Sequence, residues 1–298
     1  MVRFFSVVGA GWGAEQVSGE FAPLHTRGEE TRGESKTMTG TRKAPSKSAP
    51  KRSPDKAVAT RSQAELEREV ASTLTALKQI SSKTGRDAMA RYAIPSHNAF
   101  GVSMAAMQRL ARKLGKDHEL ALGLWKTGNY EARTVAALVD DPKLVTPAQM
   151  DRWCKDFDSW AICDTICFKL FDKTPHAYDK VEEWADLDGE FQKRAAFALL
   201  ASLALHDKQA DDKAFLPTLA RIEDAASDER NFVKKGVSWA LRGVGRRSPV
   251  LHAASVKLSR KLAASTDAVE RWIGKDALKD LTKPAVTKRI ETRRAARS

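Results

Sequence analysis

The sequence predicts an all-α protein, a solenoid of HEAT-like helical repeats. Three observations lead to this fold class. Apolar residues recur at intervals of three and four from residue 63 onward, short polar or proline-containing separators divide them, and no segment shows the alternation of a strand bounded by hairpin turns. The chain has 298 residues, 42% of them hydrophobic, which is enough to bury a sizeable core and excludes a wholly disordered protein.

Four stretches show the helical period most clearly: residues 66–80, 102–114, 195–205 and 250–262. Their apolar residues fall on one face of a helix, except in the third, which is apolar almost throughout and is typical of a buried helix. Separators such as Ser248-Pro249 occur at short intervals, and they end one helix and begin the next. We therefore expect about ten or more helices.

A weak internal repeat runs through the same region. Tyr130, Phe191 and Phe232 are each followed three residues later by a cation, and each opens a helix rich in Ala or Leu. The gaps between them are 61 and 41 residues, and the first leaves room for a further unit around Trp160. A period of 30 to 41 residues is typical of stacked helix pairs of HEAT type, in which no unit buries its apolar face alone.

The positive charge lies at the two ends of the chain. The net charge is +13, of which residues 37–60 and 283–298 carry +5 each, whereas residues 61–282 carry only +4. Such basic ends attract polyanions, which favours nucleic acid as the partner. The first 60 residues, rich in Ser, Pro and Lys in their second half, cannot bury a core. We expect a disordered tail over 1–60, the solenoid over 61–282 and a basic tail over 283–298.

Other features narrow the class of protein. No stretch reaches the roughly 18 uninterrupted apolar residues of a membrane span, so we expect a soluble protein with no membrane partner. The short apolar start after Arg3 lacks the cleavage pattern of a secretory signal, and either Met1 or Met38 fits as the true start. Three cysteines indicate reduced thiols in the cytoplasm. Cys163 and Cys167 are four apart with no His to complete a metal site, so we expect both in the core.

The first candidate for chemistry is the pair Trp160 and Asp164. These residues are four apart and therefore share one face of a helix, and Asp158 and Ser159 just before them resemble an N-cap. Apolar residues flank Asp164, and a carboxylate among apolar neighbours needs either a partner or a task. The alternative is an Asp that faces solvent beside a Trp of the core. Spacing alone leaves both interpretations open.

The second candidate is a group of cations around Trp239. Trp239 and Arg242 are three apart on one helix face, and an aromatic ring between cations suits a phosphate backbone. Alternatively, the Trp belongs to the core and the cations form a solvated face. Arg194, where an otherwise buried helix begins, must either extend to solvent or bind an anion. The cations near Trp239 are Arg230, Lys234, Lys235, Arg246 and Arg247.

Taken together, these stretches resemble the AlkD-like family of DNA alkylation repair proteins, the HEAT-repeat alkylpurine DNA glycosylases. The likeness runs from about Tyr92 to Leu281. It rests on the order and spacing of several motifs, none of which is specific alone. The motifs are Phe100-Gly-Val-Ser103, Leu124-Trp125, Glu131-Ala-Arg133, Ser159-Trp-Ala-Ile-Cys-Asp164, Arg194-Ala-Ala-Phe197, His206-Asp-Lys208, Asn231-Phe-Val-Lys-Lys235, Trp239-Ala-Leu-Arg242, Arg271-Trp272 and Asp276-Ala-Leu278.

The resemblance implies a concave basic face that holds duplex DNA, and hydrolysis of the N-glycosidic bond of purines alkylated at N3 or N7, without cofactor or metal. Many members have an acidic residue directly after the first Trp, where this chain has Ala161. The implied site residues are Asp164, Trp160 and Trp239 for catalysis and Arg194, Arg242 and Tyr92 for DNA contact, and the basic pattern adds Lys235, Arg246 and Arg247.

These residue types fit the implied reaction. An alkylated purine that is already cationic leaves without a general acid, so one carboxylate that stabilises the oxocarbenium-like sugar and positions water is enough. Indole faces add cation–π stabilisation, and a site that acts on the sugar need not flip the base. We expect Asp164 to be accessible on the concave surface where the other site residues converge.

The sequence leads to a first expectation of a monofunctional DNA glycosylase of base excision repair, acting on duplex DNA in the cytoplasm at the nucleoid, without an obligate protein partner. The alternative is a catalytically inactive HEAT-repeat protein that binds damaged or branched DNA. A third interpretation, a solenoid that binds only other proteins, would be excluded by salt-dependent duplex binding.

Overall fold

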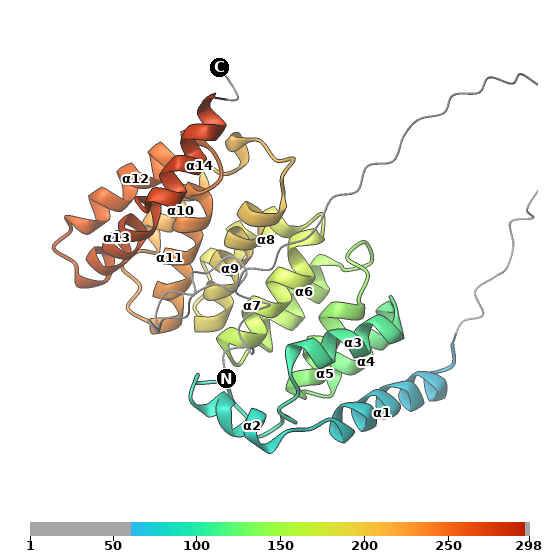
Figure 1. Ribbon diagram of the computed structural model, residues 1–298. Coiled ribbons are helices and arrows are strands. Elements are labelled where there is room, and N and C mark those ends of the chain that lie inside the picture. Colours follow the sequence, from blue (N-terminus) through green and yellow to red (C-terminus); the bar gives the residue numbers. More distant parts are fainter. Residues whose placement is uncertain (1–60, 296–298) are drawn as a thin grey trace, which may run out of the picture. The chain divides into compact units, whose positions relative to one another are not determined.

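A computed structural model describes residues 61–295, and within this range it contains fourteen α-helices, two 3₁₀ helices and no strand (Figure 1). The all-α prediction is confirmed. The first half comprises α1 (Gln63–Gln79), α2 (Lys83–Ala90), α3 (Met104–Leu114), α4 (His118–Lys126), α5 (Tyr130–Val139), α6 (Pro147–Lys155), α7 (Trp160–Lys169) and η1 (Phe171–Lys173). The second half comprises α8 (Ala177–Ala185), α9 (Glu190–His206), η2 (Asp212–Ala214), α10 (Thr218–Asp224), α11 (Asn231–Gly245), α12 (Pro249–Ala263), α13 (Ala268–Leu281) and α14 (Pro284–Ala295).

Local sequence sets where the helices begin. Ser62 and Glu65 form a reciprocal capping box at the start of α1. The hydroxyl of Ser159 accepts from the third amide of α7, and Ser248 caps α12, which has Pro249 in its first turn. These side chains satisfy amide groups that have no partner inside the helix. The predicted separators therefore mark real boundaries.

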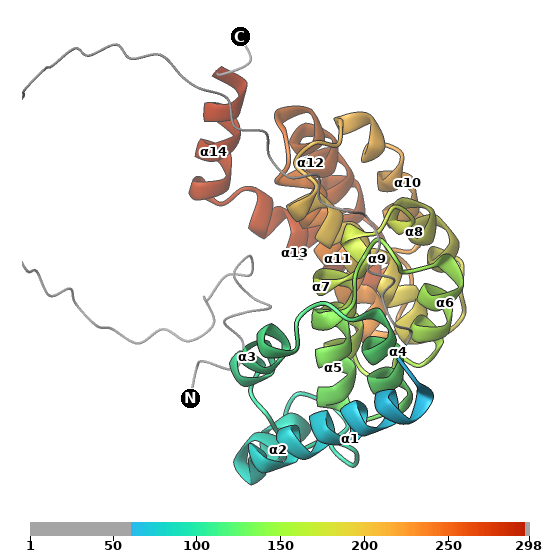
Figure 2. The same ribbon diagram turned by 90° about the vertical axis from the view of Figure 1, so that its right-hand side faces the viewer.

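The helices α5, α7, α9, α11 and α13 form a row in which each packs against the next (Figure 2). Their first residues are 30, 30, 41 and 37 positions apart, which confirms the predicted period. The helices α4, α6, α8, α10 and α12, each adjacent in sequence to members of the row, pack against one side of it. The repeat thus stacks as a HEAT-like array, and consecutive members of the row are the elements that position the site.

The core is continuous along this row. Residues 194–204 of α9 are all buried between α7, α8 and α11. The thiols of Cys163 and Cys167 are buried and reduced, and they donate to the carbonyls of Phe191 and Ala195 on α9. The prediction that these cysteines pack in the core is confirmed. At Gly274, an added Cβ would overlap the backbone of α12, so only glycine permits the close crossing of α12 and α13.

The structure describes most of the C-terminal end of the chain but not the first 60 residues. The predicted disordered tail, residues 1–60, lies outside the described residues, as does the choice between Met1 and Met38. Most of residues 283–298, the expected basic tail, form a helix that the sequence analysis did not predict, α14, which packs on α12 and α13. The reason is that Val286 and Ile290, four apart, bury one face of this basic segment. Within residues 61–295, none of the helices has the length and apolar character needed to cross a bilayer.

Candidate functional site

The site is centred on α7, which is buried over residues 161–168. It lies between α5 and α9, so apolar residues surround it on most sides. Trp160 is its first residue, and Asp164 follows one turn later. Of the two expected capping residues, Ser159 is the one that caps the helix. Spacing of four places the side chains of Trp160, Asp164 and Phe168 along one face.

Asp164 forms a bidentate ion pair with Arg194 of α9. Arg194 Nε lies 2.9 Å from Asp164 Oδ1, and Arg194 Nη2 lies 2.7 Å from Asp164 Oδ2. Asp164 is 4% exposed and Arg194 is 6% exposed. The expectation of an accessible Asp164 is therefore wrong, and so is the alternative of a solvent-facing Asp. Because a buried carboxylate needs a partner, and α9 supplies a guanidinium at the matching height, the pair forms inside the protein.

The same guanidinium also reaches α11. Arg194 Nη1 donates to the carbonyl oxygen of Phe232 at 2.6 Å, so one side chain joins three consecutive helices of the row. Burial raises the pKa of the Asp164 carboxyl from its ordinary value, while the charge and hydrogen bonds of Arg194 oppose that rise. Arg194 is buried and therefore does not extend to solvent, which was one of the two options that the sequence left open. Its role in DNA contact stays a prediction.

Trp160 contacts Tyr92, the residue that the resemblance assigns to DNA contact. The indole Nε1 donates to the Tyr92 carbonyl oxygen at 2.7 Å, across 68 residues of sequence. The ring is half-buried against a small apolar cluster that contains Met89, Ile94 and Ala99, whereas Tyr92 is 48% exposed. The helix α2 and the loop after it are thereby attached to the start of α7.

Trp239 of α11 is buried and stacks on Phe168 of α7, with ring centroids 6.3 Å apart and an interplanar angle of 24°. Phe168 in turn meets the edge of the His206 ring at 4.3 Å. Trp239 is thus a core residue that packs one turn beyond Asp164 on α7. The structure brings Trp160, Asp164, Arg194 and Trp239 to adjoining positions on α7, α9 and α11.

Arg242 lies apart from that group. Its Nε donates to the Ser238 carbonyl oxygen at 3.2 Å and lies 3.5 Å from Asp276 Oδ2 on α13. Burial lowers the pKa of Arg242, and the carboxylates of Asp276 and Asp280 oppose that effect. Lys235 is exposed one turn before Trp239. Lys235 thus matches the solvated face that the sequence offered for these cations, whereas Arg230, Lys234, Arg242, Arg246 and Arg247 are half-buried.

The two arginines after α11 have structural partners. Arg246 pairs with Asp280 of α13. Arg247 Nη1 donates to the carbonyls of Ala204 and Asp207 at 3.2 and 2.5 Å, and its Cζ lies 4.1 Å from the centre of the Phe215 ring. Arg247 thus satisfies acceptors at the end of α9, where a helix has carbonyls without partners. The assignment of both residues to DNA stays a prediction.

Sequence reasoning missed the role of Glu131. Its buried carboxylate accepts from the backbone amides of Phe100, Gly101 and Val102 at 2.9, 2.7 and 3.1 Å. Gly101 has φ +76°, and a side chain there would overlap backbone of the segment 82–86. A Glu inside the Ala-rich α5 was the available signal, since a buried carboxylate must be hydrogen-bonded.

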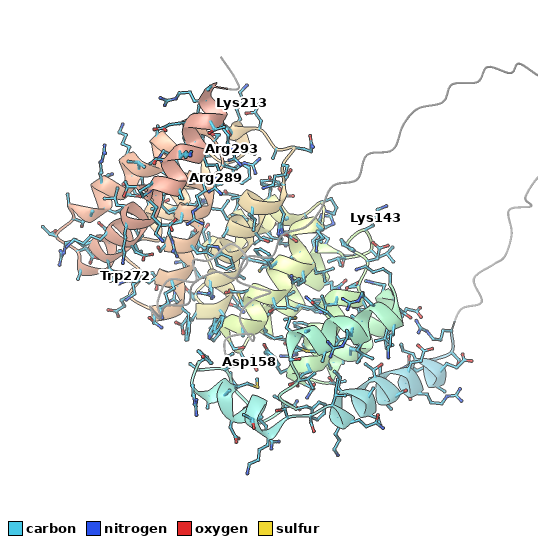
Figure 3. All side chains as sticks on the ribbon, viewed as in Figure 1. Lys143, Asp158, Lys213, Trp272, Arg289 and Arg293 are labelled. Atoms are coloured by element: carbon cyan, nitrogen blue, oxygen red, sulfur yellow. The ribbon has the colours of Figure 1, made fainter. Side chains whose placement is uncertain are left out.

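A small pocket lies near the start of α7, and Asp158 at its rim is labelled in Figure 3. It combines a cation, a carboxylate and amide and imidazole groups, so it offers polar contacts close to Trp160. No three His, Cys, Asp or Glu side chains gather as a metal site in residues 61–295. The pocket is lined by Pro95, His97, Asn98, Gly128, Tyr130, Arg133, Asp158 and Ile162.

Two comparisons with known proteins agree with this architecture. The sequence model of a family described as DNA alkylation repair enzyme matches residues 73–281. A solved structure from a new family of proteins related to the HEAT-like repeat DNA glycosylases, with affinity for branched DNA structures, is similar with a TM-score of 0.60. It is 20% identical, and the similarity covers 70% of this chain and 93% of that one, which shows a shared fold. No curated protein matches the sequence.

Proposed function

We propose a function from one premise: the chain belongs to the DNA alkylation repair enzyme family. The proposed function of this protein is to hydrolyse the N-glycosidic bond of purines alkylated at N3 or N7 in duplex DNA. Water adds to the anomeric carbon, the bond to the base nitrogen breaks and the base leaves as a neutral molecule, while the water's proton passes to solvent. The observation that carries this proposal is Asp164, held one turn below Trp160 and beside Arg194.

The groups present suit a reaction in which positive charge moves from base to sugar. An alkylated purine needs no general acid, and an ionised Asp164 stabilises the oxocarbenium-like sugar that forms. Trp160, half-buried at the start of α7, presents an indole beside that position, and its face favours a cation. Its bond to the Tyr92 carbonyl fixes the ring.

Catalysis requires the carboxylate to be uncovered. Both of its oxygens accept from Arg194 in the protein without DNA. A guanidinium binds a phosphate with the same two-pronged geometry as a carboxylate. A DNA phosphate near α9 is therefore an alternative partner for Arg194. Exchange of Arg194 onto it uncovers Asp164, and the positive charge of the alkylated nucleotide takes the place of Arg194 in keeping the carboxylate ionised.

A second candidate function is DNA binding without catalysis. Its specific support is the same ion pair, because a carboxylate that is 4% exposed and doubly bonded serves equally well as a structural link between α7 and α9. The related solved structure, whose family has affinity for branched DNA, is consistent with this alternative. Ala161, where the AlkD-like family often has an acid, points the same way.

Release of methylated purine from alkylated duplex distinguishes the two. We expect base release by the wild type, a loss of about 10²-fold or more in Asp164→Asn, and retention in Asp179→Asn, a matched control at an exposed residue of α8. Fluorescence anisotropy with the same duplex checks that Asp164→Asn still binds. Binding without base release by the wild type would establish the second function. Equal rates in the two variants would remove Asp164 from the site.

A further inference from the structure

The helix α14 lies beyond residue 281, where the match to the family ends. Val286 and Ile290 anchor it by burying their side chains. Arg293 Nη1 donates to the carbonyls of Arg246 and Arg247, at 2.9 and 2.6 Å. These carbonyls follow the last residue of α11, so α14 is fixed across the end of α11.

This attachment gathers cations from three parts of the chain. Arg289 and Arg293 lie one turn apart on α14 (Figure 3). Arg247, which follows α11, holds the carbonyl of Asp207, and the next residue is Lys208. Lys208, Arg289 and Arg293 are exposed. We use the name α14 cation cluster for Lys208, Arg247, Arg289 and Arg293.

The charges in the α14 cation cluster are close enough to repel one another. Partial burial, followed by the charges of Arg247, Arg293 and Arg289, lowers the pKa of Lys208. Burial and then the charges of Arg293 and Arg246 likewise lower the pKa of Arg289. Of the carboxylates nearby, Asp280 is already paired with Arg246, and Asp207 accepts from the Tyr178 hydroxyl and from its own loop amides. Like charges held together by packing raise the free energy of the unbound protein, and a bound anion removes that cost.

We propose that the α14 cation cluster is a second DNA-contact site, which binds a phosphodiester of the backbone away from the Asp164 site. The chemistry of the cluster indicates the class of ligand. Its exposed members are one lysine and two arginines, Lys208, Arg289 and Arg293, and such a group suits a polyanion with regularly spaced phosphates. The inference rests on the proposed function in that DNA is taken as the partner. It adds a contact in which two of the four cations, Arg289 and Arg293, lie beyond the region that the family model matches.

The test compares two charge-matched double variants on an undamaged duplex. Lys208→Gln/Arg289→Gln removes two charges of the α14 cation cluster, and Lys113→Gln/Lys257→Gln removes two exposed lysines of α3 and α12. Binding is measured at several salt concentrations. We expect the first variant to bind several-fold more weakly and to flatten the slope of log K against log salt by about one to two, with a smaller change in the control. Lys208→Arg/Arg289→Lys, which keeps the charges, should resemble the wild type.

Each outcome decides a different question. Equal slopes in the two charge-removing variants would overturn the α14 site, as would a wild type that binds no duplex. Base release at saturating protein tests the proposed function separately, because neither Lys208 nor Arg289 belongs to the Asp164 site. A slope difference without base release by the wild type would keep the α14 site and overturn the glycosylase. Equal thermal midpoints confirm that the variants are folded.

Discussion

The charged side chains differ between the centre of the helical row and its C-terminal end. The centre holds a buried pair of opposite charges, and the C-terminal end holds exposed charges of one sign. Asp164 and Arg194 are 4% and 6% exposed, and each neutralises the other. Lys208, Arg289 and Arg293 are exposed and gather with the same sign. A charge taken out of water must bring its partner along, whereas a solvated charge tolerates like neighbours until a polyanion arrives. The Asp164 site must therefore be uncovered before it can act on DNA, whereas the α14 cation cluster is exposed to a DNA phosphate without any rearrangement.

The largest effect is expected from breaking the central pair. Arg194→Ala leaves a buried carboxylate without its partner, which costs about 3–5 kcal/mol of unfolding free energy, measured by urea denaturation. Arg242→Ala is the matched control, since its partner Asp276 is 34% exposed and can be rehydrated. The replacement of both charges in Asp164→Leu/Arg194→Met should restore most of the stability but no base release. Equal losses in Arg194→Ala and Arg242→Ala would show that burial does not set the cost.

The next largest effect concerns the other region. Ile290→Ala removes a buried anchor of α14 and weakens its docking by about 2 kcal/mol or more. Because α14 is terminal, we expect faster amide exchange confined to this helix, with an unchanged thermal midpoint for the rest of the protein. Duplex affinity should fall as it does in Lys208→Gln/Arg289→Gln. Normal affinity with a loosened α14 would mean that the cations act without being held together.

The helices could be predicted from sequence because their signals are local. The starts of α7 and α12 follow from Ser159 and Ser248-Pro249, and the periodicity supplies the rest. The helix α14 was not predicted, because abundant basic residues in 283–298 obscured the helical spacing of Val286 and Ile290. A terminal helix needs only one apolar stripe to dock.

The partner of Asp164 could not be predicted from local spacing. Arg194 is 30 residues away, and which side chains meet depends on how α7 and α9 stack. A signal was nevertheless present, because 30 residues is also the interval between the starts of these two helices. A carboxylate and a cation one repeat apart occupy equivalent heights on consecutive helices of the row. The burial of both is a property of the assembled array, as is the stacking of Trp239 on Phe168.

A smaller effect is expected where the central region meets α2. Trp160→Phe keeps most of the ring but loses the donor to the Tyr92 carbonyl, which costs about 1 kcal/mol in thermal or urea unfolding. Base release should fall together with stability if the ring must be fixed. Trp272→Phe, at a Trp that is 40% exposed on α13, is the control and should change stability by less than about 0.5 kcal/mol. An equal loss of stability in Trp160→Phe and Trp272→Phe would show that the hydrogen bond from Trp160 to the Tyr92 carbonyl does not stabilise the protein.

The smallest effect separates buried pairs from partly exposed ones by pH. Asp228 lies before α11 and accepts from Arg230, with Arg230 Nε 2.9 Å from Asp228 Oδ1. The hydrogen bonds of Arg230 hold the pKa of Asp228 below its ordinary value, against some burial. When the pKa of a carboxyl is lower in the folded state than in the unfolded state, its ionisation stabilises the folded protein. This stabilisation is fully present above the unfolded-state pKa of about 3.9 and is lost as the pH falls through the folded-state pKa.

Urea unfolding of the wild type and Asp228→Asn at pH 7, 4 and 3 should therefore show a stability gap of about 1 kcal/mol or less that narrows toward pH 3. In the Arg230→Gln background the gap should shrink at every pH, since the partner that lowers the pKa is gone. A gap that widens on acidification would contradict the sign of the shift. A narrowing gap would show that the stability contributed by this partly exposed pair is intermediate. It would be smaller than that of the buried Asp164–Arg194 pair and larger than that of the α14 cation cluster, whose charges have the same sign.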